Sequence, residues 1–182
     1  GHARRRLPGM PITPFHFGPG ALLASAAPGR ISWTVFALAN VLIDLEPVGL
    51  YFLIGDPAHP WLHTVPGALA VAVLAALAGR RPCEAFLRWW NSRLSPGQAR
   101  WLWIRPGIPS PSAWAGALLG TLSHVGLDAF MHGDVRILWP LQEANPLVGR
   151  IDLGVLHAGC VIAGVAGIAI LAIRRRRAGG KR

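Results

Sequence analysis

The stretch SAWAGALLGTLSHVGLDAFM at residues 112–131 is almost wholly apolar, yet it holds His124 and Asp128. A helix needs about 20 mainly apolar residues to cross a lipid bilayer, and this stretch has that length. Three further runs have the same character, at residues 31–54, 62–79 and 153–173. The sequence therefore predicts an all-α fold, a polytopic membrane helical bundle with four transmembrane helices, in a single integral membrane domain covering residues 1–182.

The composition of the chain also indicates an integral membrane protein. Of its 182 residues, 52% are hydrophobic and only 14% are charged, whereas soluble domains have about 25% charged residues. Mean hydropathy is +0.41, and a soluble domain of this size could not shield so much apolar surface from water. A net charge of +10 would alone suggest a nucleic-acid partner. The basic residues flank the apolar runs, however, so the expected partner is the lipid bilayer and not nucleic acid.

The basic residues also predict which side of the membrane each end of the chain faces. With the N-terminus inside and four spans, sixteen of the 18 Lys and Arg residues lie inside, and only Arg136 and Arg150 lie outside. Because loops rich in Lys and Arg stay in the cytoplasm, we expect a multi-pass protein of a bacterial inner (plasma) membrane with a cytoplasmic C-terminus. Residues 80–111 interleave Arg and Trp, which is typical of a cytoplasmic interfacial segment.

Ionisable residues gather toward the outer ends of the predicted spans. His124 and Asp128 are four residues apart and share one helix face, which His132 continues. His59 and His63 repeat this spacing at the start of the second span. A charge in hydrocarbon costs at least about 2.5–3.5 kcal/mol, so such groups are expected to be paired, hydrated or metal-bound. An imidazole and a carboxylate at this spacing can both reach one divalent cation.

Asp44 and Glu46 place two more carboxylates at the same depth in the first span. Residues two apart on a regular helix point about 200° away from each other. Pro47 removes one helical hydrogen bond and favours an extended conformation at Glu46. The sequence therefore predicts a broken helix that lines a polar cavity, with both carboxylates facing one site.

Structural explanations exist for each of these residues taken singly. A His-x-x-x-Asp spacing often arises by chance, and Asp44 and Glu46 could instead hydrogen-bond neighbouring helices. Asp56 fits a turn, Asp152 fits a helix cap, and His157 fits an interfacial histidine bonded to backbone. A functional site is favoured because the carboxylates and imidazoles converge at one depth of the membrane.

Five segments, in this order, carry a family resemblance. They are Thr13-Pro-Phe-His16, Leu42-Ile-Asp44-Leu-Glu46-Pro47, His59-Pro-Trp-Leu-His63-Thr64, Gly120-Thr-Leu-Ser-His124-Val-Gly-Leu-Asp128 and Leu138-Trp139-Pro140. The set resembles the YdjM-type predicted membrane-bound metal-dependent hydrolases, also described as LexA-binding, inner-membrane-associated hydrolases. This chain departs from the family pattern at Ile43, where the family has proline, and at Glu46, where it has Asp. His59 and His63 are also one residue closer together than in the family.

The resemblance implies a metal-dependent hydrolase. The implied metal ligands are His16, Asp44, Glu46, His63, His124 and Asp128, with His59 and His132 as further candidates. One or two divalent ions, zinc being the expected metal, would lower the pKa of a bound water toward about 7. Glu46 and Asp128 are the candidate catalytic carboxylates, Glu46 as general base. Because the site opens at headgroup depth, the expected substrate is a phosphoester or ester of a lipid or another membrane-proximal molecule, at the outer leaflet side.

The position of His16 depends on the N-terminal topology. A cytoplasmic N-terminus would keep His16 away from an outer site. Residues 12–27, however, are apolar and interrupted by Pro14 and Pro19. If Met10 is the natural start, no basic cluster holds the N-terminus inside, and this short membrane-associated segment can enter from the outer side as a spanning or re-entrant piece. His16 then joins the other polar residues.

Two other classes of function remain open from the sequence. A proton- or metal-ion-coupled transporter would use intramembrane His and Asp as its pathway, and it predicts polar residues continuing to the inner face. The inner halves at residues 71–78 and 161–173 are apolar, which disfavours such a pathway. A non-catalytic metal-binding membrane protein would show a closed coordination sphere.

Overall fold

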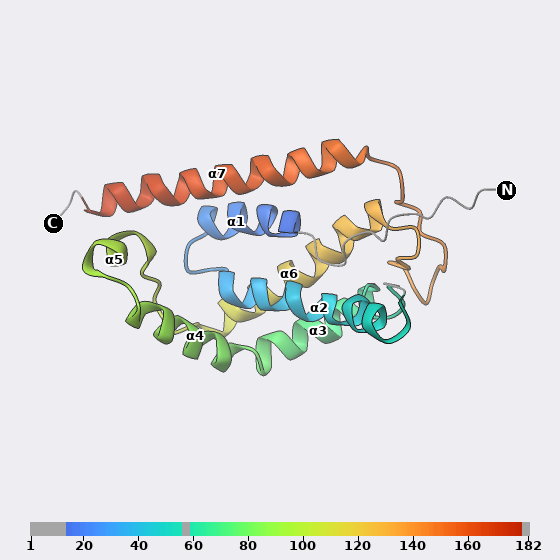
Figure 1. Ribbon diagram of the computed structural model, residues 1–182, viewed down its shortest axis with the longest axis horizontal. Coiled ribbons are helices and arrows are strands. Elements are labelled where there is room, and N and C mark those ends of the chain that lie inside the picture. Colours follow the sequence, from blue (N-terminus) through green and yellow to red (C-terminus); the bar gives the residue numbers. More distant parts are fainter. Residues whose placement is uncertain (1–13, 56–58, 180–182) are drawn as a thin grey trace.

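The computed structural model describes residues 14–55 and 59–179, and this part of the chain has helices but no strands (Figure 1). A 3₁₀ turn at Pro14–His16 leads into α1 (Phe17–Ala26), which is followed by α2 (Trp33–Ile54) and α3 (Val65–Leu77). The chain continues through α4 (Arg80–Ser92), α5 (Pro96–Leu102), α6 (Ser110–Met131) and α7 (Leu153–Gly179). The prediction of an all-α fold is confirmed.

The number of candidate membrane spans differs from the prediction. Among the described helices, α2 and α7 are each long and apolar enough to cross a bilayer. The run predicted at 62–79 contains a helix of only 13 residues, α3, which bends by 55° into α4, and the two together could form one broken span. α6 has 22 residues, but His124 and Asp128 lower its hydropathy. The apolar helices suggest a membrane protein with two or three candidate spans, and four are not clearly present.

Polar and glycine residues set the helix ends. The Ser32 hydroxyl accepts a hydrogen bond from the backbone N–H of Val35 at the start of α2, and the Thr64 hydroxyl accepts one from Gly67 at the start of α3. These are the N-cap bonds expected of Ser and Thr. Gly55 ends α2 in the left-handed region, with φ 75°, a conformation that glycine adopts without steric cost.

Pro47 does not break α2, so the predicted extended conformation at Glu46 is wrong. α2 continues through Pro47 to Ile54, and Pro47 is fully buried. A proline removes only one helical hydrogen bond, and the packing around the buried Pro47 tolerates that loss. Asp44 and Glu46 therefore lie on different faces of a continuous helix.

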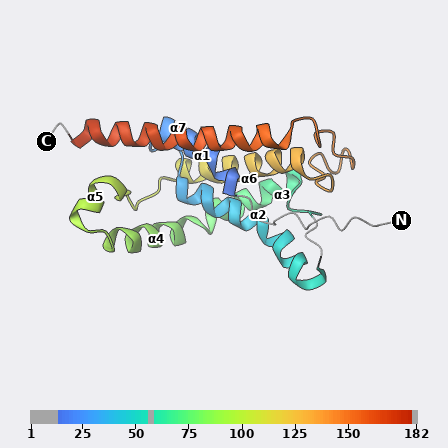
Figure 2. The same ribbon diagram turned by 45° about the horizontal axis from the view of Figure 1, so that its top comes forward.

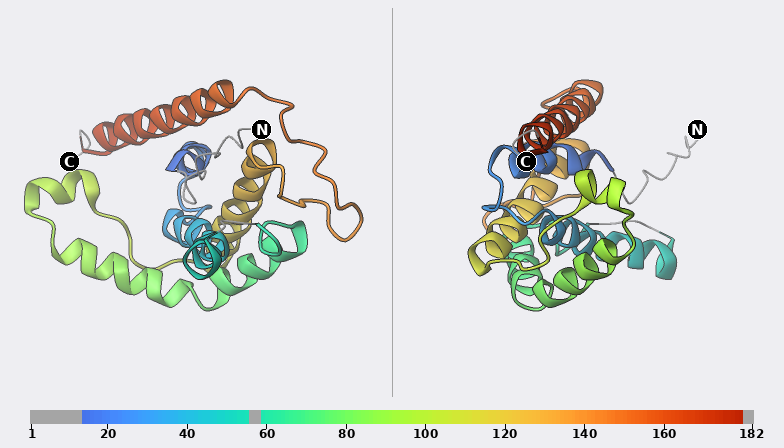
Figure 3. Two further views of the ribbon diagram at one scale, coloured as in Figure 1. Left: turned by 45° about the vertical axis from the view of Figure 1, so that its right-hand side comes forward. Right: turned by 90° about the vertical axis from the view of Figure 1, so that its left-hand side faces the viewer.

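The helices form two sets that meet along α1. α2, α3 and α6 pack on one another, while α1 packs mainly on α7. Glycines permit the closest approaches. A Cβ on Gly120 of α6 would lie 2.8 Å from the carbonyl oxygen of Phe36 on α2. Figures 2 and 3 show α7 running along one side of the molecule, and in Figure 3 α1 lies beneath it.

α2 and α6 begin side by side, because the backbone N–H of Ser32 donates to the carbonyl of Ser112. Asp44 on α2 and His124 on α6 both lie about three turns beyond this point. The two helices therefore bring these residues to the same level of the bundle. α4 and α5 lie toward the end of the molecule that holds the C-terminus, and the segment between α6 and α7 lies at the other end (Figure 1).

Candidate metal centre

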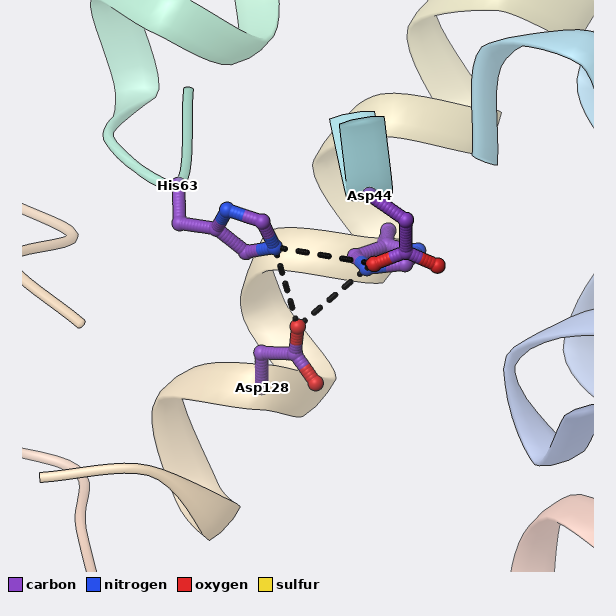
Figure 4. A group of neighbouring side chains, drawn as sticks. Asp44, His63 and Asp128 are labelled. Atoms are coloured by element: carbon purple, nitrogen blue, oxygen red, sulfur yellow. Dashed lines mark ion pairs between the residues drawn. The ribbon is translucent and has the colours of Figure 1, made fainter. Parts of the chain in front are cut away.

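Four side chains meet inside the bundle at the level where α2, α3 and α6 pack together. They are Asp44 of α2, His63 of the turn before α3, and His124 and Asp128 of α6. One ligand atom from each lies within 4.8 Å of every other, and the four residues are at most 8% exposed. Figure 4 shows Asp44, His63 and Asp128 pointing toward one another from three different elements. This set is named the Asp44 group below.

The shortest distances in the Asp44 group join imidazole nitrogens to carboxylate oxygens. Asp128 Oδ2 lies 3.2 Å from Nε2 of His63 and 3.2 Å from Nε2 of His124. Asp44 Oδ1 lies 3.1 Å from Nε2 of His124 and 4.0 Å from Nε2 of His63. Neither Nε2 makes a hydrogen bond within the described residues. Both nitrogens are thus directed at the same small region between the two carboxylates.

Asn40 determines which nitrogen of His124 carries hydrogen. Asn40 Nδ2 donates to the carbonyl of Phe36 at 2.9 Å, and its Oδ1 lies 3.0 Å from Nδ1 of His124. An amide oxygen can only accept, so Nδ1 of His124 donates and Nε2 presents a lone pair in the neutral ring. That lone pair faces two carboxylates in a buried place, which requires a cation: a proton on the ring or a metal ion between the groups.

Glu46 lies behind His63 and outside the Asp44 group. Its carboxylate accepts hydrogen bonds from the backbone N–H of Trp61 and of Leu62, the shortest at 2.7 Å. Glu46 Oε2 is 3.9 Å from Nδ1 of His63. The Glu46 side chain therefore fixes the turn that carries His63. It faces Nδ1 of His63, whereas Nε2 of the same ring is directed at Asp128. This is the position of a residue that orients a ligand.

Asp128 has a second oxygen that faces a different pair of imidazoles. Oδ1 lies 3.1 Å from Nε2 of His16 and 3.9 Å from Nε2 of His132, whereas Oδ2 faces His63 and His124. His16 is buried and its ring stacks on that of His124. A single carboxylate thus joins two sets of nitrogen ligands, the arrangement that a two-metal centre needs.

A second group adjoins the first and consists of His59, His132 and Asp134. His59 Nδ1 and the His59 backbone N–H both donate to Asp134 Oδ2, at 2.8 and 3.0 Å. The hydrogen bond from His59 lowers the pKa of Asp134 to about 2. The His59 ring stacks on His132 and lies edge-on to His63. Asp134 therefore orients His59 as Asn40 orients His124.

The Asp44 group is open on the side between α1 and α2. A cavity of about 110 Å³ is lined by His16, Asp44 and His124 together with apolar residues of both helices. Of these apolar residues, Val41 and Leu45 are more than half exposed on the outer face of α2. The way into the site from this side therefore runs past hydrocarbon side chains.

The structure brings most of the expected site residues together. Asp44, His63, His124 and Asp128 form one group, His16 and His132 flank Asp128, and His59 belongs to the second group. Glu46 is displaced from the centre. Asp152 accepts a hydrogen bond from the backbone N–H of Val155 at the start of α7, as a cap does. His157 stacks on Phe15 and belongs to neither group. Asp56 lies outside the described residues.

Sequence reasoning missed two residues that orient the imidazoles, Asn40 and Asp134. Asn40 is four residues before Asp44 and is a lone amide in an apolar run, so its position on the same helix face was a usable signal. Asp134 lies two residues after His132 and beyond the end of α6. Helical spacing therefore does not relate it to the other site residues. Comparisons of this chain with protein-family models, with curated proteins and with solved structures find no match.

Proposed function

We propose that this protein is a membrane-embedded metal-dependent hydrolase of the kind that its sequence segments resemble. The observation that carries the proposal is the Asp44 group, in which the Nε2 atoms of His63 and His124 face two buried carboxylates without hydrogen bonds among the described residues. Two imidazoles and two carboxylates are a donor set suited to zinc. A structural metal alone would not require the open side toward α1 and α2.

The residues divide into ligands and orienting groups. Asp44, His63, His124 and Asp128 would hold one ion. His59, His132 and Asp134 would hold a second, with Asp128 Oδ1 3.9 Å from Nε2 of His132. His16 lies beside Asp128 Oδ1 and serves as a further ligand there. A bound divalent ion supplies Lewis acidity and raises the acidity of a coordinated water. Asn40 and Asp134 fix the rings of His124 and His59 by hydrogen bonds to Nδ1, which strengthens the ligands. Glu46 acts on His63 through the turn that carries it, because it accepts hydrogen bonds from the backbone N–H groups of Trp61 and Leu62.

Asp44 is the better candidate for general base than Glu46. The Glu46 carboxylate already accepts hydrogen bonds from two backbone N–H groups, so it is a poorer acceptor for a proton from water. Asp44 lines the cavity that leads to the outside, and its second oxygen points away from His63 and Asp128 (Figure 4). From that oxygen Asp44 can take a proton from a water molecule that enters the cavity.

The cavity also bears on the class of substrate. Its outer wall is formed by Val41 and Leu45, which are exposed on a helix apolar enough to cross a bilayer. A phosphoester or ester attached to a hydrocarbon chain fits such an entrance better than a small ionic ester does. The transporter alternative is less well supported, because a transport pathway needs polar residues along its length. Between the site and the first turns of α2 and α6, α2, α3 and α6 instead pack together through a core of apolar residues. The expected substrate is a lipid ester or phosphoester.

The proposal is tested by measuring metal content in the detergent-purified protein. We expect one or two zinc ions per chain, lost in Asp128→Asn and retained in His157→Ala, a matched histidine outside both groups. If two ions are bound, His132→Ala should lose only one. Circular dichroism and gel filtration establish that each variant is folded. A folded wild-type protein that holds no metal would remove the basis of the hydrolase proposal and favour protons on the imidazoles, as in a transporter.

A further inference from the structure

A second and larger cavity lies at the opposite end of α2 and α6 from the metal centre. Its volume is about 690 Å³, within the range of about 300–1,000 Å³ that is usual for small-molecule sites. It is enclosed by α1, the first residues of α2 and α6, the C-terminal half of α7 and the segment after α5. Trp33, in its wall, is about 17 Å along α2 from Asp44. It is therefore separate from the metal centre.

The inner part of this cavity is mainly apolar. Ala21 and Ala24 of α1 face it from one side, Ile168 and Leu171 of α7 from another, and Leu87 of α4 from a third. The small alanines leave room between α1 and α4 that no side chain fills. Apart from the arginines, the polar side chains that line the cavity are the hydroxyls of Ser25, Ser32, Thr34 and Ser112. Because the rest of the wall is hydrocarbon, the cavity accommodates an acyl chain better than a small ionic ligand.

The rim of the cavity is strongly basic. Arg105, Arg174 and Arg175 line it, and no Asp or Glu is among the described residues that do so. Arg174 Nη2 donates to the carbonyl of Ala26 at 3.3 Å, and Arg175 Nη2 donates to the carbonyl of Trp103 at 2.8 Å. Each guanidinium has five N–H donors, so these single bonds hold the arginines at the rim and leave donors for an anion.

The change from apolar wall to basic rim coincides with the end of the apolar part of α7. Ile173 is the last residue of that part, and four arginines follow it at 174–177. Trp33 and Trp103 lie in the cavity wall at this level, as aromatic residues do at the boundary between hydrocarbon and headgroups. The cavity therefore spans the boundary, with its apolar part toward the hydrocarbon.

We infer that this cavity binds an anionic phospholipid, with the phosphate on Arg105, Arg174 and Arg175 and an acyl chain along Ala24 and Leu171. Basic pockets between membrane helices bind such headgroups. The lipid would occupy the space between α1, α7 and the segment after α5, and would thereby join the two sets of helices. It acts there as a bound partner of the fold and not as the substrate, because the metal centre lies elsewhere.

The test is native mass spectrometry of the full chain in detergent, titrated with phosphatidylglycerol or with phosphatidylcholine of identical chains. Arg174→Gln/Arg175→Gln should weaken phosphatidylglycerol binding at least tenfold, since each basic residue at a membrane surface adds substantially to the binding of anionic lipid. The control, Arg176→Gln/Arg177→Gln, removes the same charge from adjacent residues outside the cavity wall and should change binding less than twofold.

A second variant tests the apolar part without changing the charge. Ala24→Trp should fill the space and weaken phosphatidylglycerol binding by a similar factor, while glycerol phosphate without acyl chains should not compete. Unchanged binding in Ala24→Trp, equal losses in the two arginine pairs, or equal affinity for phosphatidylcholine would each overturn the inference. Metal content should stay at the wild-type value in all these folded variants, so a failure here is distinguishable from a failure of the proposed hydrolase function.

Discussion

The amide of Asn40 controls the metal-facing nitrogen of His124, although Asn40 belongs to neither group of ligands. Asn40→Leu removes the acceptor for Nδ1 while nearly preserving side-chain volume. Because the ring then loses the bond that fixes its tautomer and orientation, we expect metal affinity to fall about 10–100-fold. Competition with a chelator of known affinity measures this change in the purified protein.

A suitable control is Thr121→Val, on the same helix as His124. Thr121 is fully buried, and its hydroxyl donates to the carbonyl of Ala117 within α6. Its replacement removes a buried hydrogen bond without touching the imidazole. If Thr121→Val weakens metal binding as much as Asn40→Leu does, the effect comes from general loosening of α6 and not from the orientation of His124.

At the scale of residues, the sequence predicts the site well where helical spacing applies. The pair His124 and Asp128 is four residues apart on α6, and this alone predicts that both face one side. Glu46 was expected beside Asp44 because of Pro47, but α2 stays continuous and directs Glu46 to the turn before α3. The sequence carries no spacing signal that relates Asn40 to His124, which are 84 residues apart.

The contact between α2 and α6 depends on glycines of α6. A Cβ on Gly116 would collide with the carbonyl oxygen of Ser32, which is backbone and cannot rotate away. Gly116→Ala should therefore push the helices apart and destabilise the protein by about 1–3 kcal/mol, as overpacking does. Thermal unfolding in detergent, followed by circular dichroism, measures the change.

Gly126 provides the matched comparison on the same helix. A Cβ at Gly126 would meet nothing within 4 Å, so Gly126→Ala gains helix propensity of up to about 1 kcal/mol without any clash. We expect the unfolding temperature to fall in Gly116→Ala and to stay or rise in Gly126→Ala. Equal shifts in both variants would mean that the α2–α6 contact does not limit stability.

At the scale of elements, hydropathy located the apolar helices but not the directions in which they run. The run at 62–79 is apolar throughout, yet α3 ends at Leu77 and the chain bends by 55° into α4. The end of the apolar run at 79 coincides with the bend, because Arg80 and Arg81 open α4. Hydropathy does not indicate that the chain stays helical across this point, nor the angle at which it turns. The segment with Pro14 and Pro19 forms a 3₁₀ turn and α1, since a proline in the first turn of a helix removes no hydrogen bond.

At the scale of the whole molecule, the two proposed sites lie toward opposite ends. The segment between α6 and α7 carries Arg136 and Arg150 at the end near the metal centre, while the C-terminal end of α7 lies near α5 at the other (Figure 2). The arginines of the larger cavity belong to this second end. If the chain spans a bilayer, this charge difference should place the second end in the cytoplasm.

Single cysteines test that orientation. In a Cys83→Ala/Cys160→Ala background, Glu143→Cys marks the segment between α6 and α7, and Ser92→Cys marks the end of α4; both positions are exposed. A membrane-impermeant maleimide should label Glu143→Cys in intact bacterial cells and Ser92→Cys only in inverted vesicles, with a permeant maleimide labelling both. The reverse pattern would put the metal centre on the cytoplasmic side. Labelling of both from one side would mean that the chain between them does not cross the membrane, so neither leaflet could be assigned to either site.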